Sequence, residues 1–344
     1  MTAGQKAIGL FMKHLRKTKI GYVYAVAAIG LLASALLGIL MGAAKFSLLD
    51  FAAAITDGDS PAGKILWYVR IPRVLASLLC GGALAVSGAV IQGVLANRLA
   101  SPSIIGVNSG AGLAVTICAA TGIAGGWRMS VFAFLGAFAA VMAVSFGAKK
   151  WGASRGTVIL MGVAMNSLLG ALSDVLKILV PEVSILSNDF RIGDFSGVTY
   201  SNLITASVVI LIAFLLLLTL SNELDVLTLG DENAKSLGLN TGVMRTLFLM
   251  LSAALAGTAV SIAGLLSFVG LLVPHAVRRI STGESRHLIP LCGLFGAGFV
   301  TLCDTLARTV FAPYELPVGI IMAFLGAPFF LFILIKGKGG HSRA

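Results

Sequence analysis

The most constraining feature of this sequence is a series of apolar runs, each about 20 residues long, separated by short polar segments. One of them, residues 203–220, contains no charged residue, and 58% of the 344 residues are hydrophobic while 11% are charged. A run of about 20 apolar residues is what an α-helix needs to cross the hydrocarbon core of a bilayer. The sequence therefore predicts an all-α polytopic membrane protein, with residues 1–344 forming a single transmembrane domain.

The apolar runs predict ten transmembrane helices. We expect the boundary between the seventh and eighth helices near Gly257–Gly264. The first run is too long for the core of a signal peptide and is not followed by a convincing cleavage site, so we expect it to remain as a membrane span. The predicted spans are about 21–44, 74–96, 104–123, 129–148, 157–180, 203–220, two within 246–273, 288–307 and 318–335.

The distribution of basic residues predicts the orientation. Ten spans place both termini on one side, and with the termini inside, the cytoplasmic segments hold 17 of the 25 Lys and Arg residues. This asymmetry follows the positive-inside rule. We therefore predict a basic cytoplasmic tail (1–20), a second cytoplasmic tail (336–344) and a cytoplasmic segment at 224–240. The net charge of +11 reflects this topology beside membrane lipid and does not indicate nucleic-acid binding.

Segment 224–240 is polar yet has the pattern of a folded element. Asp231 and Glu232 follow Gly230 at the start of a predicted short helix, and Gly238 can close that helix in a left-handed cap. Such a helix could lie on lipid or dock a soluble partner, and its acidic polar face favours docking, since an anionic lipid surface would repel it. The residues of this predicted docking element are Leu229, Gly230, Asp231, Glu232, Ala234, Lys235, Leu237 and Gly238.

No pattern in the sequence indicates catalysis or a bound cofactor. The four cysteines lie singly in apolar runs and the four histidines are scattered, so we expect neither a metal nor a haem site. Residues 58–64 have the spacing of a phosphate-binding loop, but Ile65 occupies the position where Ser or Thr must hold magnesium. We expect this chain not to be an enzyme and not to bind ATP or Mg²⁺.

Three polar residues are expected inside the membrane. Asp174 and Asp304 lie near the outer ends of their spans, where Asp174 can pair with Lys177 one turn on. Asn166 is more central, about 14 Å from the inner surface, and could line a pathway or make an interhelical hydrogen bond. A proton-driven carrier would need acidic residues deep in the bundle. The expected positions of Asp174 and Asp304 near the outer ends of their spans therefore argue against such a carrier.

Small residues recur every fourth position in two spans, which places them on one helix face. Such faces let membrane helices approach closely, so we expect both rows to be buried helix contacts. The rows are Gly81, Ala85, Ala89 and Gly93, and Gly106, Gly110 and Ala114.

Several motifs together resemble a known family. They are Arg70–Arg73 (RIPR), Gly82–Gln92 (GALAVSGAVIQ), Asn97–Gly112 (NRLASPSIIGVNSGAG), Gly230–Gly238, Phe268–His275 (FVGLLVPH), Asp304–Arg308 (DTLAR), Glu315–Gly319 (ELPVG) and Leu325–Pro328 (LGAP). The chain resembles, from Arg70 to Lys336, the permease subunits of ATP-binding-cassette (ABC) importers for iron-siderophore complexes, haem and vitamin B12, the large ten-helix type.

The resemblance implies an assembly in the inner membrane of a bacterial cell. Two permease subunits, identical or paralogous, would surround one pathway and bind two cytoplasmic ATPase subunits, which carry ATP and Mg²⁺. A substrate-binding protein outside the membrane would deliver the cargo, which we expect to be a ferric siderophore. Cobalamin or haem is the alternative cargo, and a secondary transporter without an ATPase is a more distant alternative.

The resemblance also implies roles for individual residues. Segment 224–240 corresponds to the ATPase coupling element, and two loops to a cytoplasmic gate, with Asn97 and Leu99 on one loop and Ala153 and Ser154 on the other. Ala153 departs from the hydroxyl residue expected there. Three arginines are expected at one level outside the membrane, where they either anchor helix ends by snorkelling or bind glutamates of the binding protein. They are Arg70, Arg73 and Arg308.

Overall fold

The computed structural model is helical, without a strand in the part that it describes, which is residues 3–338 apart from 43, 45–47, 124–125 and 151–153. The helices are α1 (Ala3–Leu40), α2 (Leu48–Thr56), α3 (Pro61–Ile65), the π-helix η1 (Leu66–Arg70), α4 (Ile71–Val94), α5 (Val107–Ala120), α6 (Gly126–Lys150), α7 (Arg155–Leu179), α8 (Val183–Ile192), α9 (Tyr200–Thr219), α10 (Ser221–Thr228), α11 (Asp231–Ser236), α12 (Thr241–Ala263), α13 (Val269–Ile280), α14 (Ser285–Thr309) and α15 (Val318–Lys338).

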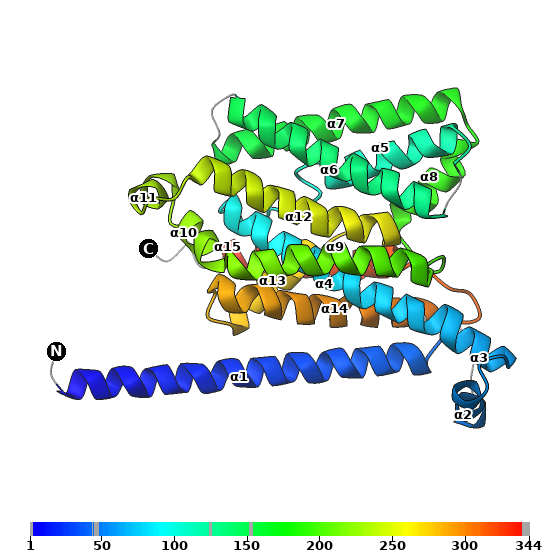
Figure 1. The fold of residues 1–344 in the computed structure, drawn as a ribbon, viewed down its shortest axis with the longest axis horizontal. Coiled ribbons are helices and arrows are strands. Elements are labelled where there is room, and N and C mark those ends of the chain that lie inside the picture. Colours follow the sequence, from blue (N-terminus) through cyan, green and yellow to red (C-terminus); the bar gives the residue numbers. More distant parts are fainter. Residues whose placement is uncertain (1–2, 43, 45–47, 124–125, 151–153, 339–344) are drawn as a thin grey trace.

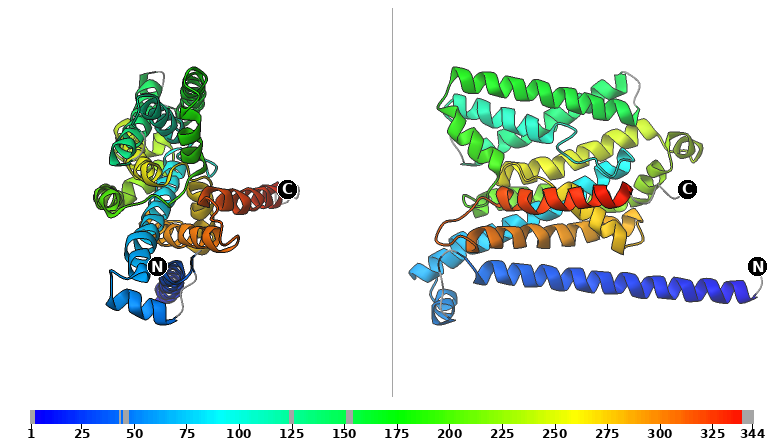
Figure 2. Two further views of the ribbon diagram at one scale, coloured as in Figure 1. Left: turned by 90° about the vertical axis from the view of Figure 1, so that its right-hand side faces the viewer. Right: turned by 180° about the vertical axis from the view of Figure 1, so that it is seen from behind.

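The long helices run side by side, with α1 at one edge of the bundle and α7 at the other (Figures 1 and 2). Among the described residues, seven helical segments are long and apolar enough to cross a membrane. These segments make the chain a multi-pass membrane protein. The other three expected spans correspond to α5, α13 and α15, and the 12 residues of α13 extend about 18 Å, less than a bilayer core.

Helix α4 lies at the centre of the bundle because small residues let its neighbours approach closely. It packs along α14 and α12, and Gly81 lies against Gly296 so tightly that a Cβ on either residue would overlap the other's carbonyl oxygen. Gly110 of α5 and Gly136 of α6 are packed against each other in the same way. The predicted burial of these two small-residue rows is confirmed where α4 meets α14 and where α5 meets α6.

The break between the seventh and eighth spans lies at Gly264, the C-terminal limit of the predicted range Gly257–Gly264. Helix α12 runs through Gly257, which packs against Phe134 of α6, and ends at Ala263. The chain turns at Gly264, whose φ of 69° lies in the left-handed region that glycine adopts without steric cost. A Cβ there would also overlap the carbonyl oxygen of Phe190, so close packing rather than the apolar pattern sets the break.

Helix α8 lies in a stretch that the sequence pattern marked only as polar. Its C-terminal end is seated on the α12–α13 turn by two backbone hydrogen bonds, Leu265 N–H to Phe190 O and Asp194 N–H to Ala263 O, both 2.9 Å. The segment that resembled a phosphate-binding loop is a helix start instead, where the Ser60 hydroxyl accepts a hydrogen bond from Gly63 N–H and caps α3.

The bundle has two distinct ends. Helices α10 and α11 project at the end where α1 begins and α15 ends, whereas α2, α3 and α8 lie at the opposite end (Figures 1 and 2). The structure thus places the segment that contains α11 on the same side as the described parts of both tails.

Candidate functional site

The candidate coupling segment, residues 224–240, divides its leucines between two environments. Leu224 and Leu227 of α10 are buried in the bundle, whereas Leu229 and Leu237 are 58% and 64% exposed. As predicted, α11 begins after Gly230, and Gly238 closes it with a φ of 83°. The segment therefore has a buried root and an exposed apolar tip.

Ala234 corrects one expectation about this segment. We expected it among the residues that meet a partner, but it is fully buried inside the chain. Helix α11 is amphipathic and must bury one face, and its small alanine is the residue that fits against the bundle. The outward face is formed instead by Glu232, Asn233, Lys235, Ser236 and Leu237.

Asp231 ties α11 to two membrane helices. The Arg245 Nη2 atom of α12 donates to both carboxylate oxygens at 2.7 and 2.8 Å, and Arg155 of α7 lies 3.7 Å from the same carboxylate. Partial burial alone would raise the pKa of Asp231, but the Arg245 hydrogen bond and the charges of Arg245, Arg155 and Lys235 prevail and hold the pKa below its ordinary value.

Asp225 makes a second attachment, from α10 to α14. Its carboxylate accepts hydrogen bonds from the Ser285 backbone N–H at 3.0 Å and from the Ser285 hydroxyl at 2.6 Å. Ser285 is the first residue of α14, where free N–H groups and the helix dipole favour a negative charge. Asp225 thus fixes the start of a membrane helix from another element.

The predicted gate residues lie in two loops at the same end. The Asn97 side chain accepts a hydrogen bond from Leu99 N–H at 2.9 Å, which shapes the turn after α4. Leu99 is half exposed beside a cavity of about 320 Å³. Ser154 caps α7 by accepting from Thr157 N–H at 3.1 Å, and Ala153 lies outside the described residues.

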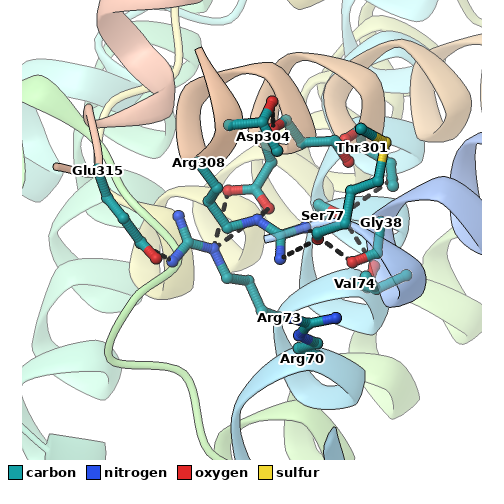
Figure 3. A network of polar contacts seen from close by, with 12 residues as sticks. Gly38, Arg70, Arg73, Val74, Ser77, Thr301, Asp304, Arg308 and Glu315 are labelled. Atoms are coloured by element: carbon teal, nitrogen blue, oxygen red, sulfur yellow. Dashed lines mark hydrogen bonds and ion pairs between the residues drawn. The ribbon is translucent and has the colours of Figure 1, made fainter. Parts of the chain in front are cut away.

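At the opposite end of the bundle, Arg73 contacts three carboxylates, one on α14, one on the α8–α9 connection and one on the α14–α15 connection. Its Nε lies 3.0 Å from Asp304 of α14, its Nη1 lies 2.7 Å from Glu315, and its Nη2 lies 3.4 Å from Asp194. Figure 3 shows Asp304 between the guanidinium groups of Arg73 and Arg308. Asp304 is completely buried there.

The other two arginines are also bonded within the chain. Arg308 forms an ion pair with Asp304 at 3.0 Å and donates to the carbonyl oxygen of Gly38 in α1. Arg70 donates to the carbonyl oxygens of Ile39 and Leu40 at the end of α1. Each of the three arginines is only 3% exposed.

We expected these arginines to be exposed if they form a basic docking cluster, and this expectation of exposure is wrong because all three are buried. A guanidinium group taken out of water must find hydrogen-bond acceptors, and here Arg70, Arg73 and Arg308 find them at helix ends and on Asp304. The partly exposed charges at this cluster are the carboxylates of Glu315 and Asp194. The four-residue spacing of Asp304 and Arg308 was the sequence signal that could have revealed their pairing.

Asn166 combines the two roles that the sequence left open. It donates hydrogen bonds to the carbonyl oxygens of Ser103 and Ile104 and accepts one from the Ser109 hydroxyl at 2.6 Å. It also lines a cavity of about 280 Å³ with Asn108 and Ser109. The predicted pairing of Lys177 with Asp174 is confirmed, at 3.4 Å.

Comparisons with known proteins identify the family. The model of the FecCD transport family matches residues 30–336. The chain belongs to the FecCD transport family. It is 36% identical over 303 residues to the Fe(3+)-citrate import system permease protein YfmD of Bacillus subtilis, covering 88% of this chain and 91% of that protein. It is 33% identical over 324 residues to the hemin transport system permease protein HmuU of Yersinia pestis, covering 91% and 97%.

A solved structure extends the likeness to the whole FecCD fold. It is a metal-chelate type ABC transporter in an inward-facing conformation, 28% identical, with a TM-score of 0.80 and coverage of 92% of this chain and 99% of that one. This FecCD chain is thus a multi-pass permease of the ABC importer class. Its relatives are named as permease proteins of transport systems.

Proposed function

We propose that this FecCD permease imports a ferric siderophore into the cytoplasm across the inner membrane of a bacterial cell. A second permease subunit would complete the pathway, two ATPase subunits would bind ATP and Mg²⁺ on the cytoplasmic side, and a substrate-binding protein would deliver the cargo from outside. The chain itself contributes the pathway and the attachment for the ATPases.

The observation that carries this proposal is the exposed tip of the coupling segment. Leu229 and Leu237 are large apolar residues exposed at the end of the bundle, on either side of the polar residues of α11. Exposed apolar groups rimmed by polar residues are typical of protein interaction sites. A membrane importer powered by separate ATPases needs one such site that is firmly joined to its membrane helices, and residues 224–240 have both properties.

The lining of the 280 Å³ cavity supports an oxygen-rich chelate as cargo. Its walls carry the hydroxyl and amide groups of Ser103, Asn108, Ser109 and Asn166, with Lys177 and Arg191 also on the lining. Such groups exchange hydrogen bonds with the carbonyl and carboxylate oxygens of an iron chelate. The described lining offers no His, Tyr, Cys or Met to the iron of haem.

The inner gate remains part of the proposal. Leu99 lies beside the 320 Å³ cavity, which shares Ser103 and Asn108 with the cavity described above. We assign Leu99 and Asn97 to the constriction at the cytoplasmic end of the pathway, with Ser154 holding the start of α7 beside it. Ala153 keeps its proposed place in the same constriction.

Reconstitution tests this function directly. The permease, the ATPase subunits and the binding protein would be placed in vesicles, and uptake of radiolabelled ferric trihydroxamate, haemin and cyanocobalamin would be measured with and without ATP. We expect ATP-dependent uptake of the ferric chelate. Uptake of haemin or cyanocobalamin alone would reassign the cargo, and uptake that is indifferent to ATP would indicate a secondary transporter.

A paired substitution tests the docking tip in the same assay. Leu237→Asp places a charge in the proposed apolar contact, so we expect loss of ATPase subunits on co-purification and loss of uptake. Asn222→Asp, which adds the same charge at an exposed position of α10 outside residues 224–240, is the matched control and should retain both. Full retention of the ATPases by Leu237→Asp would remove α11 from the interface.

A further inference from the structure

We propose that Asp225 and Asp231 are the positioning residues through which the coupling segment moves the membrane helices. Asp231 would join α11 to α7 and α12, and Asp225 would join α10 to α14. A displacement of the tip would then reach three membrane helices together. This inference rests on the proposed coupling function of residues 224–240.

The size of α11 explains why it needs an anchor. A helix of six residues has little stability of its own, so its position depends on what holds it. Its buried contact is the small side chain of Ala234, which can fill a gap but can transmit little force. The hydrogen-bonded ion pair between Asp231 and Arg245 at 2.7 Å is the strongest directional contact between α11 and the bundle.

Arg155 extends this anchor to a second membrane helix. Its Nη2 donates to the carbonyl oxygen of Leu227 at the end of α10 at 2.6 Å, and it lies 3.7 Å from the Asp231 carboxylate. One guanidinium group at the start of α7 therefore holds both sides of the α10–α11 turn. Movement of that turn must carry α7 with it or break two contacts of a half-buried charge.

Asp225 makes the corresponding contact on the other side of the segment. Its two hydrogen bonds from Ser285 fix it to the N-terminus of α14. The opposite end of α14 carries Asp304, which binds Arg73 of α4. Helix α14 thus connects the coupling segment with the buried ion-pair cluster across the full length of the bundle, as Figure 1 shows for its two ends.

Distance measurements in the assembled transporter test the link without any knowledge of the cargo. Spin labels on Ser236→Cys in α11 and Ser167→Cys in α7 would report their separation with and without ATP, because both positions are exposed and the native cysteines at 80, 118, 292 and 303 are buried. If the anchor is rigid, the distance distribution is narrow and alike in both states. Asp231→Asn should broaden it, and Glu232→Gln should not.

Transport measurements on charge-reversal variants at Asp231 and Arg245 distinguish a positioning role from a contribution to stability alone. Asp231→Arg and Arg245→Asp should each lower the ratio of uptake to ATP hydrolysed by roughly tenfold, within the usual range of coupling between sites, while hydrolysis continues. The double variant Asp231→Arg with Arg245→Asp restores opposite charges and should recover most of the ratio. Equal loss in the double variant, or an unbroadened distance in Asp231→Asn, would overturn the proposal.

Asp225 is tested by its own pair of variants. Asp225→Asn should broaden the distance between labels on Ser236→Cys and Arg286→Cys, at the start of α14, whereas Glu223→Gln in the same turn of α10 should leave it unchanged. An Asp225→Asn distribution identical to that of the parent protein would confine the link to Asp231. If the parent complex hydrolyses no ATP with its ATPase subunits, that result contradicts the proposed function. The distance measurements would still show whether Asp225 and Asp231 hold the coupling segment to the membrane helices.

Discussion

Asp304 is the most deeply buried charged residue in the described part of the chain. Its buried carboxylate lies 3.0 Å from both Arg73 and Arg308, and Arg73 in turn contacts two further carboxylates. Removing such charges from water costs several kcal/mol for each ion, and mutual attraction with good hydrogen-bond geometry offsets that cost. Removing any one of these charges would therefore take a counter-charge away from a buried partner.

We therefore expect Asp304→Asn to destabilise the permease strongly, by about 3–5 kcal/mol, because it leaves two buried guanidinium groups without their shared carboxylate. Asp174→Asn is the control: its carboxylate is 68% exposed beside Lys177, and exposed pairs contribute only about 0–1 kcal/mol. Thermal unfolding in detergent, followed by size-exclusion chromatography, compares the two. Similar midpoints for both variants would show that the cluster is dispensable.

For individual residues, the sequence predicted roles that depend on the residue's own backbone conformation better than roles that depend on contacts with distant side chains. Gly238 was predicted to cap α11 because only its immediate neighbours matter to a left-handed φ. The burial of Arg73 was not predicted, because its three acceptors lie 121, 231 and 242 residues away in the chain. Depth in the membrane and a charge one turn away could be estimated from the sequence, but a charge on a distant segment could not.

Helix contacts in this fold depend on pairs of small residues. Gly88 of α4 faces the backbone of Gly270 in α13, and a Cβ on Gly88 would overlap the carbonyl group of Gly270. The two helices can separate only by disturbing the α4 contacts with α12 and α14. Gly112 of α5 has the same residue type in a helix, but a Cβ there would meet nothing within 4 Å.

Gly88→Ala should therefore lower stability by about 1–3 kcal/mol, the usual cost of overpacking. Gly112→Ala should raise stability by up to about 1 kcal/mol, because alanine favours the helix. Unfolding midpoints in detergent would show opposite shifts for the two substitutions. Shifts of the same sign would contradict the close α4–α13 approach.

Helix α11 should keep its attachment over the physiological pH range. The pKa of Asp231 is lowered in the folded state, so the stability that its carboxylate contributes is present above its ordinary pKa of about 3.9 and is lost as pH falls through the lowered value. The mobility of a spin label on Ser236→Cys should stay constant between about pH 5 and 8 and rise only in stronger acid. A transition near neutral pH would mean that another group controls the attachment.

The apolar pattern identified the helices that correspond to the expected spans, α5, α13 and α15 among them, but it missed α8. Runs of about 20 apolar residues corresponded to α1, α4, α6, α7, α9, α12 and α14. Helix α8 was missed because its ten residues mix apolar and polar side chains and are held by backbone contacts with the Ala263–Leu265 turn. Gly257 and Gly264 look alike in sequence, and only their neighbours in the fold decide which one ends α12.

The whole molecule separates its two kinds of polar cluster to opposite ends. The Asp225 and Asp231 anchors lie at the end with α10 and α11, and the Arg73–Asp304–Arg308 cluster lies at the end with α3 (Figures 1 and 3). Between them, packing depends on small residues and apolar side chains. Helix α14 contacts Asp225 through Ser285 at one end and contributes Asp304 to the arginine cluster near the other. A displacement at one end can therefore be transmitted to the other along one continuous helix.

This arrangement predicts the orientation of the protein in the membrane. The positive-inside rule places in the cytoplasm the end of the bundle whose segments hold 17 of the 25 basic residues. This orientation puts α11 inside and the α2–α3 turn outside. In intact cells, an impermeant maleimide should therefore label Asp59→Cys and leave Ser236→Cys unlabelled until the cells are opened. Both positions are exposed, and the native cysteines at 80, 118, 292 and 303 are buried, so each signal comes from one site. The reverse pattern would invert the topology and place the proposed ATPase contact outside the cell, while labelling of both from one side would contradict the separation of the two ends by the bilayer.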